Sequence, residues 1–125
     1  MTHLPHMLAA GLVASLAACG SLRTVDAYRA DTTKLLATRS TQLQRCYDDA
    51  LRADGRAAGT VTVQFVIASD SGAISKPTVE PAKSTAPPAL GQCVVKAIDG
   101  LVLAPADRQQ ARATFVYEFK PAPAT

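Results

Sequence analysis

The chain has 125 residues, a net charge of +3, 48% apolar residues and 18% charged residues. This composition indicates a globular protein. The net positive charge is too small to be typical of a nucleic-acid-binding protein. Both histidines, His3 and His6, lie at the start of the chain, so the remainder lacks Ser-His-Asp or Cys-His catalysis and imidazole metal ligands. It also lacks a glycine-rich phosphate loop. We therefore expect no enzyme, with no catalytic residue, metal, cofactor or small-molecule substrate.

The amino-terminal segment resembles a lipoprotein export signal. No Asp, Glu, Lys or Arg precedes Arg23, and Met7 to Leu16 is an apolar run too short to span a bilayer. Small residues then precede Cys19, a pattern similar to a bacterial lipobox. We expect a signal peptide over 1–18 and lipidation at Cys19, which anchors the chain to a membrane; the alternative is a buried helix that ends in a structural cysteine. Gly20, where inner-membrane lipoproteins carry Asp, favours the outer membrane, facing the periplasm.

The first predicted helix follows a short tether. Residues 19–30 are expected to be that tether, which keeps the domain near its membrane. Asp31 or Thr32 can cap a helix over 31–53, which ends at Asp54-Gly55. Its apolar residues recur at helical spacing: Leu36, Leu43, Tyr47, Ala50 and Leu51.

Two predicted strands come next. Residues 60–68 alternate between apolar and polar positions, which is typical of a strand. A turn at Asp70-Ser71-Gly72 leads to a weaker strand over 73–79, where Pro77 favours an edge position.

A second helix and a third strand complete the domain. Ser84 or Thr85 can cap the helix, and its apolar stripe comprises Leu90, Cys93, Val94, Ala97, Ile98 and Leu101. The third strand, 112–120, places Ala113, Phe115, Tyr117 and Phe119 on one face.

These elements predict an α+β domain over 31–121, followed by a disordered tail over 122–125. The order is helix, strand, strand, helix, strand. A three-stranded antiparallel sheet in the order 2-1-3 would then have both helices on one face, and the third strand would lie at an edge.

Cys46 and Cys93 lie on the core-facing stripes of the two helices, which should pack side by side. In an exported chain, such a pair predicts a disulfide bond. The alternative is two reduced, buried cysteines that act as small apolar residues.

Five segments and one single residue carry a resemblance to a known family: Leu43–Leu51, Gly59–Ile67, Gly72–Ile74, Val79, Leu90–Val94 and Phe115–Phe119. Together they resemble the AgmX/PglI-type C-terminal domain, which is itself similar to the C-terminal domain of TonB energy transducers. The paired cysteines are the most specific feature. The chain departs from the pattern at Leu101–Pro105, where such domains carry a Trp-x-Phe-Pro-like signature. It also has neither the membrane helix nor the long linker of TonB, so we expect no energy transduction by this chain alone.

The resemblance implies a non-catalytic envelope lipoprotein that binds a protein partner. By likeness to TonB-type domains, strand 112–120 would pair with an extended segment of that partner, and the side-chain contacts would come from Phe115, Val116 and Tyr117. Alternatively, the charges in this strand protect the edge against pairing. A homodimer through the edge stays open.

A second hypothesis is a structural or assembly lipoprotein that contacts anionic lipid, lipopolysaccharide or cell wall. The contacts would come from basic helix residues: Lys34, Arg39, Arg45, Arg52 and Arg56. Asp48, Asp49 and Asp54 interrupt them, which is typical of an ordinary solvated helix face. For an enzyme, the polar clusters Tyr47–Asp49 and Asp70-Ser71 lack a nucleophile–base pair.

Overall fold

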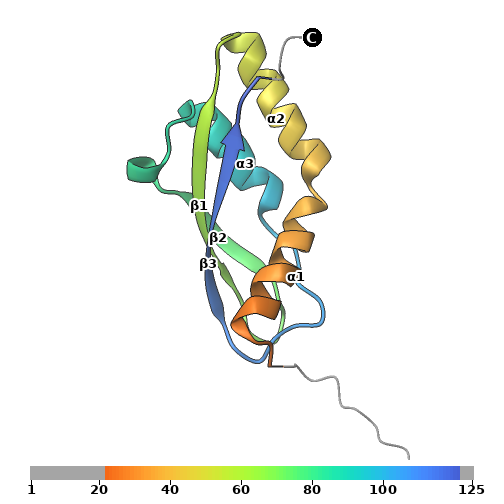
Figure 1. Ribbon diagram of the computed structural model, residues 1–125. Helices are drawn as coiled ribbons and strands as arrows, with labels where there is room; N and C mark the ends of the chain where they lie inside the picture. The colour runs from red at the N-terminus through yellow and green to blue at the C-terminus, as the bar shows by residue number, and fades with distance from the viewer. Residues whose placement is uncertain (1–21, 122–125) are drawn as a thin grey trace, which may run out of the picture.

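The computed structural model describes residues 22–121 (Figure 1). The elements are α1 (Val25–Ala37), α2 (Ser40–Ala53), β1 (Gly59–Ile67), β2 (Ile74–Val79), the 3-10 turn η1 (Pro81–Lys83), α3 (Pro88–Ile98) and β3 (Ala111–Phe119). The expected signal peptide over 1–18, the lipidation site Cys19 and the expected tail over 122–125 lie outside the described residues.

The three strands form one antiparallel sheet in the order β2-β1-β3. Strand β3 pairs with β1 without interruption, from Gly59 opposite Phe119 to Ile67 opposite Ala111. The pairing of β2 with β1 shifts register between Gln64 and Val66. The α+β class and the 2-1-3 strand order are therefore confirmed.

The helices cover one face of this sheet (Figure 1). Helix α3 lies over β1 and β2, since Gly91 approaches Val61 and Val79. Helix α2 lies over β3, and the ring centroids of Tyr47 and Phe119 are 5.3 Å apart. The alternating residues of β1 point into the core, which they share with α3: Val61, Val63, Phe65, Ile67, Leu90, Val94 and Ile98.

The helix expected over 31–53 is instead two helices. The N–H groups of Thr38 and Arg39 donate to the carbonyls of Leu35 and Leu36, three residues back (3.1 and 3.0 Å). The Thr38 hydroxyl also donates to the Leu35 carbonyl (2.6 Å). This tighter turn ends α1, because the Thr38 hydroxyl is hydrogen-bonded to the Leu35 carbonyl, which a continuing helix would use for its own backbone hydrogen bond.

Helix α1 also begins earlier than expected. The Thr24 hydroxyl accepts a hydrogen bond from the Ala27 N–H (3.1 Å), and Asp26 lies in the first turn, where a negative charge is favourable. Residues 25–30, expected to belong to the tether, are therefore helical.

Candidate partner-binding edge and groove

Strand β3 is an open edge of the sheet, and the hydrogen bonds of β1 show which of its backbone groups point outward. The carbonyls of Thr60 and Thr62 accept hydrogen bonds from Thr85 and Glu80, so the even-numbered residues of β1 point away from β3. Because this orientation alternates along an antiparallel strand, the odd-numbered residues of β1 bond to β3. Val63 lies opposite Phe115, so the backbone groups that point outward from β3 belong to its even-numbered residues: Arg112, Thr114, Val116 and Glu118.

Nothing in residues 22–121 covers this row of backbone groups, whereas the opposite edge of the sheet is interrupted. No backbone hydrogen bond from outside the sheet reaches the four outward residues of β3 in that range. On β2, the N–H of Ile74 donates to Leu101 (2.7 Å), and its carbonyl accepts from Gly100 (3.2 Å). Pro77 has no N–H, and Lys76 has a φ of 54°. Among the described strands, β3 is therefore the edge that an added strand can extend.

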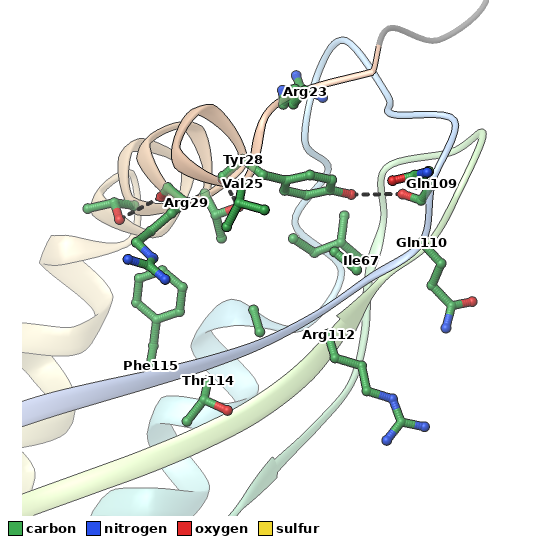
Figure 2. A pocket seen from close by; sticks show the side chains of 14 residues that line it. Arg23, Val25, Tyr28, Arg29, Ile67, Gln109, Gln110, Arg112, Thr114 and Phe115 are labelled. Carbon is green, nitrogen blue, oxygen red and sulfur yellow. Dashed lines mark hydrogen bonds between the residues drawn. The ribbon is translucent and has the colours of Figure 1, made fainter.

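A groove of about 580 Å³ runs between α1 and the first half of β3 (Figure 2). Ile67, which is fully buried, contributes to its lining on the sheet side. Val25 of α1 also lines the groove and is 74% exposed. Tyr28 extends across from α1, and its hydroxyl donates to the Gln109 carbonyl (3.2 Å). The groove therefore offers an apolar surface directly beside the open edge.

The charges that line the groove are all positive: Arg23, Arg29 and Arg112. The structure shows no ion pair for Arg29 or Arg112 within residues 22–121. In Figure 2, Arg29 extends from α1 towards Phe115, whereas Arg112 extends away from the groove. The guanidinium group of Arg29 therefore lies on the groove face of β3, and that of Arg112 extends away from the groove.

Arg23 fastens the start of α1 to the loop before β3. Its backbone N–H donates to Oδ2 of Asp107 (2.7 Å), its Nε to Oδ2 of Asp31 (2.8 Å) and its Nη2 to the Pro105 carbonyl (2.6 Å). Asp107 is buried, and the backbone N–H of Gln109 donates to its Oδ1 (2.8 Å). This last hydrogen bond is the main cause that lowers the pKa of Asp107; desolvation opposes it, and Arg23 supports it. The ionised carboxylate thus anchors α1 beside β3.

The structure separates the three residues expected to contact a partner. Phe115 lines the groove and stacks on Phe65, with ring centroids 5.9 Å apart. Tyr117 lies on the same face, and its buried hydroxyl has no hydrogen-bond partner among residues 22–121. Burial raises the pKa of this phenol to about 12. Val116 points to the opposite, open face of the sheet and is 62% exposed.

Sequence reasoning missed the contribution of α1 to the site. Val25, Tyr28 and Arg29 lie in the segment expected to be a tether. The available signal was Thr24 followed by Asp26, a cap with an acidic first turn.

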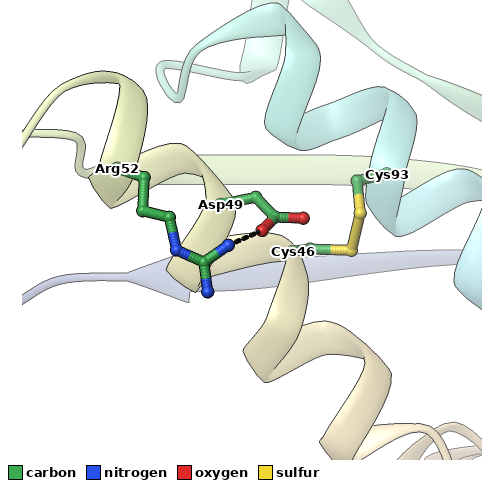
Figure 3. The surroundings of a disulfide bond; sticks show 4 residues. All are labelled: Cys46, Asp49, Arg52 and Cys93. Carbon is green, nitrogen blue, oxygen red and sulfur yellow. Dashed lines mark hydrogen bonds and ion pairs between the residues drawn. A yellow bond between two sulfur atoms is a disulfide. The ribbon is translucent and has the colours of Figure 1, made fainter.

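The predicted disulfide bond joins α2 to α3. The sulfur atoms of Cys46 and Cys93 are 2.01 Å apart, and their Cα atoms are 5.6 Å apart (Figure 3). Figure 3 also shows Arg52 paired with Asp49 on α2 (2.6 Å). One of the basic residues proposed to contact anionic surfaces is therefore neutralised by its own helix.

No helix within residues 22–121 combines the length and apolar character needed to cross a membrane. In the same part of the chain, no group of three or more His, Cys, Asp or Glu side chains is placed to hold a metal ion. The chain matches no protein-family model, no curated protein and no solved structure. Its resemblance to the AgmX/PglI-type and TonB C-terminal domains therefore stays a prediction.

Proposed function

We propose that this chain is a non-catalytic envelope lipoprotein whose disulfide-linked domain binds an extended segment of a protein partner along β3. Lipidation at Cys19 would hold it at the outer membrane, facing the periplasm. The observation that supports binding is the nine-residue edge strand with its outward row of backbone N–H and C=O groups. An added strand would satisfy these groups, and the neighbouring groove would receive its side chains.

The charges of β3 leave its middle available. Arg112 lies near the start of the strand, and Glu118 pairs with Lys120 at its end (3.5 Å). Charged residues on an edge oppose unwanted pairing. Between them, Thr114 and Val116 are exposed and uncharged, so a partner strand meets no charge at the centre of the edge.

The test uses proline at an outward position. Val116→Pro removes a backbone N–H that points outward from the sheet. It removes no hydrogen bond to β1, because the backbone N–H of Val116 points away from β1. A photo-reactive residue at position 114, in the full chain in its native envelope, should cross-link to a partner. We expect Val116→Pro to abolish that adduct and Val116→Ala, which keeps the N–H, to retain it.

The fold of each variant is checked by cooperative unfolding of the purified chain in urea, because the covalent Cys46–Cys93 disulfide also persists in an unfolded chain. An equal yield of the same adduct from folded Val116→Pro would contradict pairing along β3.

The alternative function, contact with anionic lipid, lipopolysaccharide or cell wall through basic helix residues, has less support. Arg52 is paired with Asp49, and Arg39 is only partly exposed, with its Nε buried. Lys34, Arg45 and Arg56 are exposed, but they lie on three different segments: α1, α2 and the turn after α2. Binding of the chain to anionic vesicles, lost at high salt, would favour this alternative.

A further inference from the structure

We propose that the partner edge of β3 is also complementary to itself, so that two copies of this chain form a symmetric dimer through an antiparallel β3–β3 pair. The proposal rests on the same open edge as the proposed function. It identifies a second copy of this chain as one occupant of that edge, and this copy would compete with any other partner strand for the backbone groups of β3. The pairing would join two three-stranded sheets into one continuous sheet.

The register follows from the outward residues. Two antiparallel copies of β3 centred on Phe115 place Arg112 opposite Glu118 and Thr114 opposite Val116. All four outward-pointing residues of each strand then meet outward-pointing residues of the other, so no outward N–H or C=O within this stretch is left unpaired.

Charge selects this register over its neighbours. Directly opposite side chains in a sheet lie close enough to attract or repel, and here each Arg112 faces a Glu118, twice by symmetry. A slide by two residues in one direction places Arg112 opposite Lys120, which is repulsive. A slide in the other direction leaves Arg112 opposite Val116, with no opposite charge. The Glu118–Lys120 pair that the dimer would replace is exposed, at 67% and 76% of the two side chains, and such pairs stabilise little.

Side-chain size on the other face agrees with the same register. There, Ala111 lies opposite Phe119, and Ala113 lies opposite Tyr117, so each large ring of one copy meets a small residue of the other. Both alanines line the groove between α1 and β3, which gives the aromatic residues of the second copy an apolar surface to contact. Phe115 meets its own symmetry mate at the centre.

Charge reversal gives a test in the full chain in its native envelope. Two differently tagged copies of the wild type should co-purify. Two copies of Arg112→Glu place carboxylates opposite each other, and two copies of Glu118→Arg place guanidinium groups opposite each other. Each variant should therefore lose association with itself by about tenfold or more. When Arg112→Glu is expressed together with Glu118→Arg, both opposing pairs become attractive, and association should return.

Lys96→Glu is the matched control, because it reverses a positive charge at an exposed residue of α3, which lies over β1 and β2, and it should leave association intact. All variants must unfold cooperatively in urea as evidence of folding, because the covalent Cys46–Cys93 disulfide also persists in an unfolded chain. The proposal is overturned if the wild-type copies do not co-purify, if Arg112→Glu associates with itself as the wild type does, or if the mixed pair does not recover. A partner adduct that survives in any of these cases would leave the proposed function standing, whereas its survival in Val116→Pro would remove that function.

Discussion

Two tyrosine hydroxyls on the helix-covered face of the sheet have opposite expected effects on stability. The Tyr47 hydroxyl donates to the Ala57 carbonyl (2.8 Å) within the core, whereas the buried Tyr117 hydroxyl has no hydrogen-bond partner in the described part of the chain. Loss of a paired group leaves the carbonyl unsatisfied, but loss of an unpaired group removes only a desolvation cost. We expect Tyr47→Phe to lower the free energy of unfolding by about 1 to 2 kcal/mol, and Tyr117→Phe to leave it unchanged or raise it. Urea denaturation at pH 7 measures both, and an equal loss would contradict this difference.

The same Tyr117 predicts a change of stability at alkaline pH. Its pKa in the folded chain is raised to about 12, from an ordinary value of 10. Between these values the unfolded chain has lost the phenol proton while the folded chain keeps it, so rising pH favours unfolding. The effect of Tyr117 on the unfolding free energy is constant below pH 10, and the unfolding free energy then falls as the pH rises towards 12. Tyr117→Phe should therefore show a smaller decline in unfolding free energy than the wild type over this range; parallel declines would contradict burial of the phenol.

At the level of elements, Thr24 determines where α1 starts and thus one wall of the groove. Its hydroxyl caps the Ala27 N–H, whereas the Thr33 hydroxyl, also exposed, donates to the Arg29 carbonyl (2.8 Å), which already serves the helix. We expect Thr24→Ala to destabilise the first turn of α1 by about 1 kcal/mol, and Thr33→Ala to have a much smaller effect. Hydrogen exchange at the Ala27 and Tyr28 amides, compared between these two variants, measures this; similar exchange in both would show that the cap does not hold the helix.

The elements also differ in how far the sequence predicts them. The alternation in β1 and β3 is local, so the buried faces and the 2-1-3 order follow from period-two patterns and chain connectivity. The helix breaks at Thr38 because the Thr38 hydroxyl binds the Leu35 carbonyl. The spacing of apolar residues does not reveal such a side-chain hydrogen bond. The groove was beyond prediction because it depends on contacts between distant residues. Arg23 binds Asp107 across 84 positions, and Tyr28 binds the Gln109 carbonyl across 81 positions; these long-range contacts hold α1 beside β3.

In the whole molecule, stability and recognition lie in different places. The disulfide joins α2 to α3, whereas the open edge belongs to β3, whose outward residues carry exposed side chains. Substitutions at Arg112, Val116 and Glu118 therefore change side chains that the core does not use. This separation is what allows the edge to be tested by variants that keep their fold.

The disulfide between α2 and α3 should make a large contribution to the stability of the fold. It closes a loop of 47 residues, and the loss of chain entropy in the unfolded state corresponds to about 4 kcal/mol for a loop of that length. A domain of this size typically unfolds with only about 5 to 15 kcal/mol. The Cys46→Ala/Cys93→Ala variant should therefore lose a large share of its unfolding free energy, and reduced wild type should unfold at a similar urea concentration. Because Cys46 is buried, part of the loss in the double variant comes from packing, and the reduced wild type separates the two causes. A reduced chain as stable as the oxidised one would show that the cross-link does not stabilise this fold.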